Sequence, residues 1–146
     1  MKDIISLPHC GTFVMNGRER GCLLGLQGGQ FEKHPKYEGV ETKLAYLMFI
    51  PQDILRIISE AGCVVTDFFV IKAENGVPMH EHNVKKGREL YFGGSGGCVT
   101  ILGSDKELVG SFDMDENIFT TIYIGEWHGV ECAQPVTFFG IKYDMR

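Results

Sequence analysis

The sequence predicts an all-β fold, a sandwich or barrel, with one α-helix packed outside it. Short β-branched and aromatic segments recur along the chain between glycine-rich turns, and glycine accounts for 19 of the 146 residues. Only one segment, Pro51–Ala61, has its apolar residues at helical spacing. With 44% hydrophobic residues, the chain has enough apolar material for a folded core, and its length fits one structural domain.

The strands of the predicted barrel core lie in residues 64–146. The longest, Val64–Lys72, is rich in β-branched and aromatic residues, and the turn-forming pair Asn75-Gly76 follows it. Further strands follow, each separated from the next by turn residues: Pro78–His82, Glu89–Phe92, Cys98–Leu102, Leu108–Phe112, Ile118–Ile124, His128–Cys132 and Val136–Tyr143.

Residues 1–63 are predicted to be N-terminal strands and the helix, packed on the barrel within the same structural domain. Proline at position 51 suits the first helical position, and Asp53 complements the helix dipole in the first turn. The preceding segments are expected to be two strands, a loop and a further apolar run, in this order: Thr12–Met15, Cys22–Leu26, Gln27–Tyr37 and Lys43–Phe49.

Charge and cysteine content exclude several classes of function. The chain has 14 Lys+Arg against 19 Asp+Glu and no basic stripe, which argues against a nucleic-acid partner. No apolar run approaches the roughly 18 residues needed to cross a membrane, and the N-terminus lacks a signal-peptide pattern. The five cysteines are widely spaced without a C-x-x-C pair, which is typical of thiols in a reducing compartment. The predicted location is therefore the cytoplasm.

One stretch of the chain carries the residue types of a metal site. His80 and His82 are two apart on a predicted strand and therefore point to the same face. Glu89 follows a turn and would lie beside them, and His128 would close the set from a later strand. Three imidazoles and one carboxylate suit one divalent metal ion such as Fe, Mn, Ni or Zn. The alternative is a purely structural cluster without a metal.

Two further residues are candidates for catalytic roles. Tyr91 is two positions after Glu89 and should face the same interior, where its phenol would donate to a substrate or only line the pocket. Glu126 is two positions before His128 and is the candidate for an additional acid or base.

The histidine stretch resembles the first motif of the cupin superfamily, roughly G-x(5)-H-x-H-x(3–6)-E-x(6)-G. His80, His82, Glu89 and Gly96 hold matching positions, and the leading glycine is displaced to Gly76. The resemblance covers about residues 64–144. It implies a double-stranded β-helix (jelly-roll barrel).

The second cupin motif, roughly P-x-G-x-x-H-x(3)-N, is matched at Gly125 and His128. Tyr123 stands at the proline position and Cys132 at the asparagine position. The resemblance therefore implies His128 as the fourth metal ligand, beside the two histidines and the glutamate of the first motif.

The six residues between His82 and Glu89, together with Glu89-Leu90-Tyr91, resemble the spacing of the cupin-type phosphoglucose isomerases. Those enzymes have Thr-x-Gly immediately before the first histidine, where this chain has Val77-Pro78-Met79. Their sugar-phosphate contacts are therefore not carried over.

For function, these observations predict a metal-dependent cupin acting on a small polar molecule: a sugar, a sugar phosphate, or a keto or hydroxy acid. The reaction would be of the isomerase, lyase or dioxygenase type. The alternative is a non-catalytic cupin that binds or senses a small molecule such as a sugar. A sensor normally carries a DNA-binding or effector domain, and none is recognised here, which favours an enzyme. A homodimer is also expected, because N-terminal strands can extend a partner's sheet.

Overall fold

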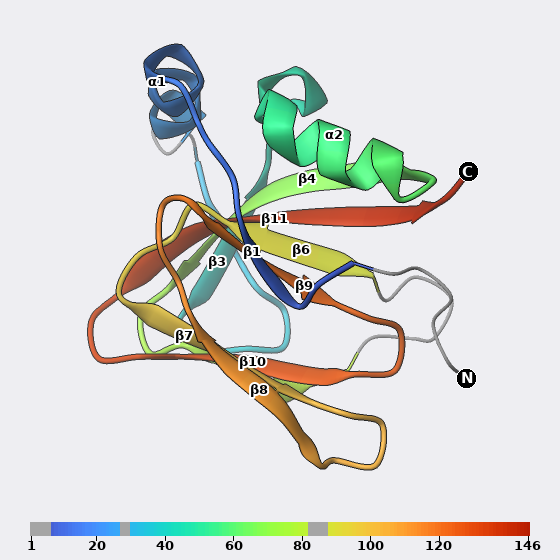
Figure 1. The fold of residues 1–146 in the computed structure, drawn as a ribbon. Coiled ribbons are helices and arrows are strands. Elements are labelled where there is room, and N and C mark those ends of the chain that lie inside the picture. The colour runs from blue at the N-terminus through green and yellow to red at the C-terminus, as the bar shows by residue number, and fades with distance from the viewer. Residues whose placement is uncertain (1–6, 27–29, 82–87) are drawn as a thin grey trace.

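The computed structural model describes residues 7–26, 30–81 and 88–146 as two antiparallel β-sheets that face each other, with helices outside one of them (Figure 1). In chain order the elements are β1 (Cys10–Thr12), α1 (Gly17–Leu26), β2 (Glu32–Lys33), β3 (Val40–Leu44), the 3₁₀-helix η1 (Leu47–Phe49), α2 (Gln52–Glu60), β4 (Cys63–Ala73), β5 (Val77–His80), β6 (Glu89–Phe92), β7 (Gly97–Leu102), β8 (Leu108–Asp113), β9 (Ile118–Ile122), β10 (Trp127–Cys132) and β11 (Val136–Met145).

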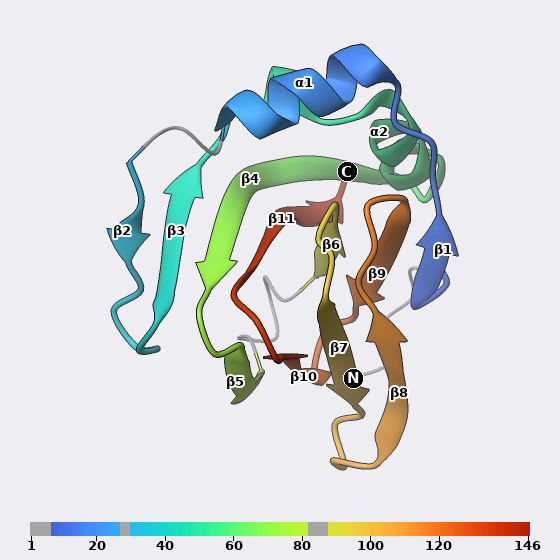
Figure 2. The ribbon, with the colours of Figure 1, turned by 90° about the vertical axis from the view of Figure 1, so that its left-hand side faces the viewer.

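The larger sheet has the strand order β1-β9-β6-β11-β4-β3-β2, and the smaller sheet has the order β5-β10-β7-β8. Figure 2 shows the two sheets as opposite walls of a barrel, with both helices on the far side of β4 and β11. This arrangement confirms the predicted jelly-roll barrel with a helix packed outside it. The N-terminal strands β1, β2 and β3 belong to the same sheet as β4 and β11.

Two hydrophobic cores lie on the two faces of the larger sheet. Successive residues of β11 alternate between them, as side chains of a strand do: Phe138 packs inside the barrel and Phe139 on the helix side. Ile54 and Ile58, one turn apart on α2, are fully buried against the outer face. Burial of each such side chain contributes about 2 kcal/mol, which holds α2 on the sheet.

The first helix, α1, is the main difference from the sequence prediction, because Cys22–Leu26 was expected to be a strand and that expectation is wrong. A capping box starts the helix. Asn16 Oδ1 accepts the Glu19 N–H at 2.8 Å, and Glu19 Oε1 accepts the Asn16 N–H at 3.2 Å. The second oxygen of Glu19 accepts the N–H of Gln52 at 2.7 Å, which ties the starts of α1 and α2 together. The side chain of Leu23, on the inner face of α1, is buried.

Two further N-terminal expectations differ from the structure: the predicted loop Gln27–Tyr37 contains strand β2, and the predicted apolar run Lys43–Phe49 is the end of β3 followed by η1. The remaining expected elements are in place with small shifts of their ends. The helix predicted at Pro51–Ala61 is α2, and the strands predicted between residues 64 and 143 correspond to β4 to β11. The predicted strand Thr12–Met15 is displaced to β1, whose three residues pair with β9. In the described part of the chain, no helix is long and apolar enough to span a membrane.

Candidate functional site

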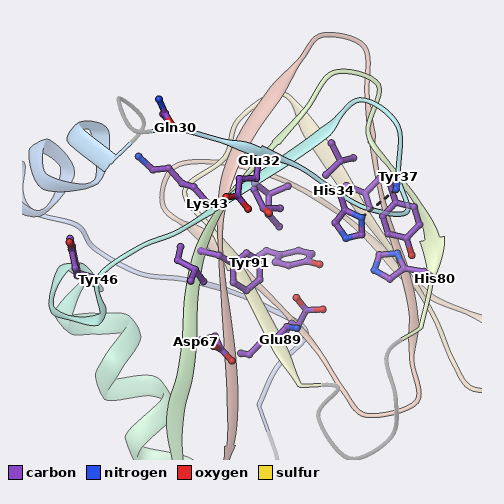
Figure 3. Close-up of a pocket in the computed structure, with 17 residues that line it drawn as sticks. Gln30, Glu32, His34, Tyr37, Lys43, Tyr46, Asp67, His80, Glu89 and Tyr91 are labelled. Atoms are coloured by element: carbon purple, nitrogen blue, oxygen red, sulfur yellow. Dashed lines mark hydrogen bonds between the residues drawn. The ribbon is translucent and has the colours of Figure 1, made fainter.

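A cavity of about 730 Å³ opens on the inner face of the larger sheet. Its walls come from β3, β4, β6 and β11, from β5 of the smaller sheet, and from the segment around β2. Figure 3 shows three labelled rings grouped at one end and Tyr46 at the other, with Tyr91 and Glu89 between them; the three rings are those of His34, Tyr37 and His80. A cavity of this size accommodates a small organic molecule.

The turn between β4 and β5 brings the first histidine to this cavity. Gly76 has φ +86°, in the left-handed region, and a Cβ at this position would lie 2.2 Å from the carbonyl oxygen of Val130. Glycine alone permits both the conformation and the close approach. β5 then pairs with β10 so that His80 lies directly opposite His128.

His80 and Glu89 line the cavity, and the buried His128 lies next to both of them. The ring centroids of the two histidines are 4.3 Å apart, and Nε2 of His128 lies 3.3 Å from Oε1 of Glu89. Glu89 and His128 are 2% and 1% exposed, so their charges and dipoles interact with little solvent screening. The structure therefore brings together three of the four side chains that the sequence predicts as metal ligands.

The hydrogen bonds of the two histidines suit metal coordination. Nδ1–H of His80 donates to the carbonyl of Pro78 at 2.7 Å, which leaves the lone pair on Nε2, the usual arrangement of a metal-binding imidazole. Nδ1 of His128 lies 3.5 Å from the carbonyl of Glu126, so its Nε2 faces the Glu89 carboxylate. The residue types, two imidazoles and a carboxylate, are those that bind first-row divalent metals.

The predicted ligand His82 lies outside the described residues. Within the described ranges, no group of three His, Cys, Asp or Glu side chains is placed so that it could hold a metal ion. The four-ligand set His80, His82, Glu89 and His128 therefore stays a prediction.

Tyr91 lies in the wall of the cavity, with its ring 5.0 Å from Phe138 and 6.1 Å from His128 between centroids. Burial raises the pKa of Tyr91 well above the usual tyrosine value, and the negative charge of Glu89 and a hydrogen bond to it act in the same direction. The phenol is therefore a neutral hydrogen-bond donor at physiological pH.

The raised pKa of Tyr91 predicts a specific loss of stability at alkaline pH. The folded protein holds this proton more tightly than the unfolded chain, in which a tyrosine has a pKa of about 10. The stabilisation that this proton gives the folded protein is complete below about pH 10. It is lost as the pH rises further, by up to about 1.4 kcal/mol per pH unit. In metal-free protein, Tyr91→Phe should therefore lose stability less steeply than wild type above about pH 10 in urea unfolding.

The matched control is Tyr46→Phe, which removes a phenol that is 72% exposed. Its unfolding free energy should follow the pH dependence of the wild type. Parallel curves for wild type and Tyr91→Phe would contradict the prediction.

Glu126, the candidate acid or base, does not line the cavity. Its carboxylate accepts Nε2–H of His9 at 2.8 Å and the backbone N–H of Tyr123 at 2.7 Å. These contacts fix the turn that precedes β10 and attach the segment before β1 to it. A role for Glu126 in proton transfer stays a prediction.

Among the cavity residues that were not identified from the sequence are three with polar groups relevant to binding: His34, Tyr37 and Lys142. The first two follow β2 in a segment with the composition of a loop, and no spacing rule indicates that this loop returns to the barrel. Lys142 is opposite Asp67 on one neighbouring strand and Glu89 on the other. Its inward direction follows from strand alternation, but only once the register is known.

No protein-family model matches the sequence, and no curated protein matches it either. Among solved structures, the chain is similar to an oxidoreductase of the 2OG-Fe(II) oxygenase family from Burkholderia pseudomallei, with a TM-score of 0.66, 11% identity, and coverage of 88% of this chain and 79% of that chain.

The chain is also similar to oxalate decarboxylases from Lactobacillus farciminis and Bacillus subtilis, with TM-scores of 0.51 and 0.52 and identities of 12% and 17%. These matches cover 80% and 79% of this chain but only 31% and 28% of the decarboxylase chains. At such identities the likeness concerns the fold, and it confirms the predicted jelly-roll barrel.

Proposed function

We propose that this cupin-fold chain is a metal-dependent enzyme that acts on a small polar molecule in the cavity. The observation that carries the proposal is the meeting of His80, His128 and Glu89 beside a cavity of about 730 Å³. Two imidazoles and a buried carboxylate at one end of a cavity form a mixed N/O donor set, which suits a first-row divalent metal.

In this proposal His80, His82, Glu89 and His128 hold one divalent ion, Fe, Mn, Ni or Zn. The bound metal would polarise a carbonyl or hydroxyl oxygen of the substrate. Tyr91, whose raised pKa keeps the phenol protonated, would donate its hydrogen bond to the substrate in place of Glu89. Chemistry of this kind serves isomerases, lyases and dioxygenases.

The names of the solved structures with this fold add support. One is an Fe(II) oxygenase-family protein, and the others are oxalate decarboxylases, for one of which Mn(II) centres are named. A metal-dependent reaction is therefore favoured over the alternative of a non-catalytic sugar-binding or sugar-sensing cupin. A homodimer is the remaining part of the proposal, since β2 forms an edge of the larger sheet to which a second copy can add a strand.

The test of the proposed function combines metal analysis with a ligand screen. Purified protein should contain close to one divalent metal per chain, and chelation should remove it without unfolding the barrel, whose strands pack independently of the metal. A thermal-shift screen of sugars, sugar phosphates and keto or hydroxy acids should then give stabilisation of the metal-loaded protein that the chelated protein lacks. Protein that takes up no divalent metal would rule the proposal out.

A further inference from the structure

The orientation of His34 is set by the backbone of its own loop. Its Nδ1 accepts the N–H groups of Lys36 at 3.0 Å and Tyr37 at 3.3 Å. Because Nδ1 is an acceptor, the proton of the neutral imidazole is on Nε2. The backbone N–H of His34 donates to Val40 at 2.8 Å, and its ring stacks on that of Tyr37 with centroids 4.6 Å apart. Among the described residues, Nε2 has no hydrogen-bond partner, so it is a fixed donor in the cavity wall.

Lys142 supplies a positive charge to the same cavity. It lies on β11 between Asp67 of β4 and Glu89 of β6, each directly opposite it in the sheet. Burial lowers the pKa of His34, and the charges of Lys36 and Lys142 lower it further. Both groups line the cavity, and the positive charge of Lys142 favours the neutral form of the His34 imidazole.

We propose that Nε2–H of His34 and the ammonium group of Lys142 form a subsite that binds the carboxylate of the substrate. The ring of Tyr37 contacts both His34 and the candidate ligand His80, with centroids 4.6 Å and 5.2 Å apart, and Lys142 lies opposite the candidate ligand Glu89 in the sheet. A short organic acid therefore reaches both places at once, with its carboxylate at His34 and its reacting end at His80 and Glu89. Only the placement of the reacting end at the candidate metal ligands rests on the proposed function; the carboxylate subsite does not.

The charges of the wall favour a carboxylate over a phosphate. One ammonium group and one neutral N–H donor match a single negative charge. Across the whole wall, three carboxylates (Glu32, Asp67 and Glu89) face two lysines (Lys43 and Lys142), and this excess of negative charge opposes a dianion more strongly than a monoanion. A sugar phosphate is therefore disfavoured relative to a small carboxylic acid.

The experiment titrates chelator-treated protein with butyrate, with its neutral analogue butyramide, and with inorganic phosphate, and follows the ring signals of the histidines by NMR. Butyrate should shift the His34 signal in the wild type, whereas butyramide should not. His34→Phe, which keeps an aromatic ring against Tyr37, and Lys142→Met should each weaken butyrate binding about tenfold. The matched control is Lys72→Met, which removes the same charge from a lysine of β4 that is outside the cavity wall and should bind butyrate like the wild type.

Two results would overturn the subsite: butyrate affinity that is unchanged in Lys142→Met, or phosphate that binds the wild type more tightly than butyrate. The wild-type comparison of butyrate with butyramide provides a test even if a variant fails to fold. Because the titration uses metal-free protein, its outcome is separate from that of the proposed function. If the protein binds butyrate as expected but takes up no metal, the proposed subsite is supported and the proposed metalloenzyme function is ruled out.

Discussion

Replacing both His80 and His82 by alanine is expected to reduce the metal content of the purified protein from close to one ion per chain to nearly none. Each imidazole supplies one coordinating nitrogen, and loss of two of four ligands leaves a site that cannot compete with water and buffer. The β-sheet structure should persist, because buried apolar residues such as Leu90, Val99 and Phe138 hold the barrel together. Elemental analysis and circular dichroism of the same preparation measure both effects.

The control for this experiment is His34→Ala, which removes an imidazole from the same cavity wall but not from the proposed ligand set. It should retain its metal. If the double variant binds as much metal as the wild type, the site lies elsewhere in the chain and the ligand assignment is wrong.

Gly76→Ala should cause a large loss of folding stability, about 2–4 kcal/mol in urea unfolding. Two effects act together at this position. The φ angle of +86° is unfavourable for an alanine, and the added Cβ would lie 2.2 Å from the carbonyl oxygen of Val130, a backbone atom that cannot rotate away. The variant should also weaken metal binding, because relief of the clash moves β5, and with it His80, away from β10.

Gly96→Ala separates the two effects. Gly96 has a similar φ of +81°, but an added Cβ would meet no atom within 4 Å. Only the conformational cost remains, about 1 kcal/mol. If both variants lose the same free energy of unfolding, the close approach of Gly76 to Val130 does not contribute to the cost of Gly76→Ala.

The second half of the fold was predictable because its signals are local. Each strand from β4 to β11 has its own β-branched or aromatic segment and its own turn residues, so errors stayed at the strand ends. α1 has no comparable apolar pattern in its sequence, Gly17–Leu26, which contains three glycines. Its only local signal is the capping pair Asn16 and Glu19, and the rest of its stability comes from tertiary contacts that the sequence does not display.

The candidate site likewise has residues that local spacing predicts and residues that only long-range pairing brings to the cavity. His80, Glu89 and His128 meet because strand alternation and one turn place them together, and both can be read from spacing. His34 reaches the cavity through long-range pairing instead. The loop that carries it closes where the carbonyl of Gly39 accepts the N–H of Glu74, a contact between residues 35 positions apart. No local pattern encodes such a contact.

The ribbon formed by β2 and β3 is attached to the barrel along one side, where five residues of β3 pair with β4 (Figure 2). It carries His34 and Tyr37 in its connecting loop, whereas His80, Glu89 and His128 lie on β5, β6 and β10. In the proposed function, the ribbon supplies His34 to the carboxylate subsite, whereas Lys142 of β11 and the proposed metal ligands lie outside it. A library confined to residues 30–44 would vary one wall of the pocket while leaving the strands of the metal site untouched, which makes this ribbon the natural place to redirect the protein toward new substrates.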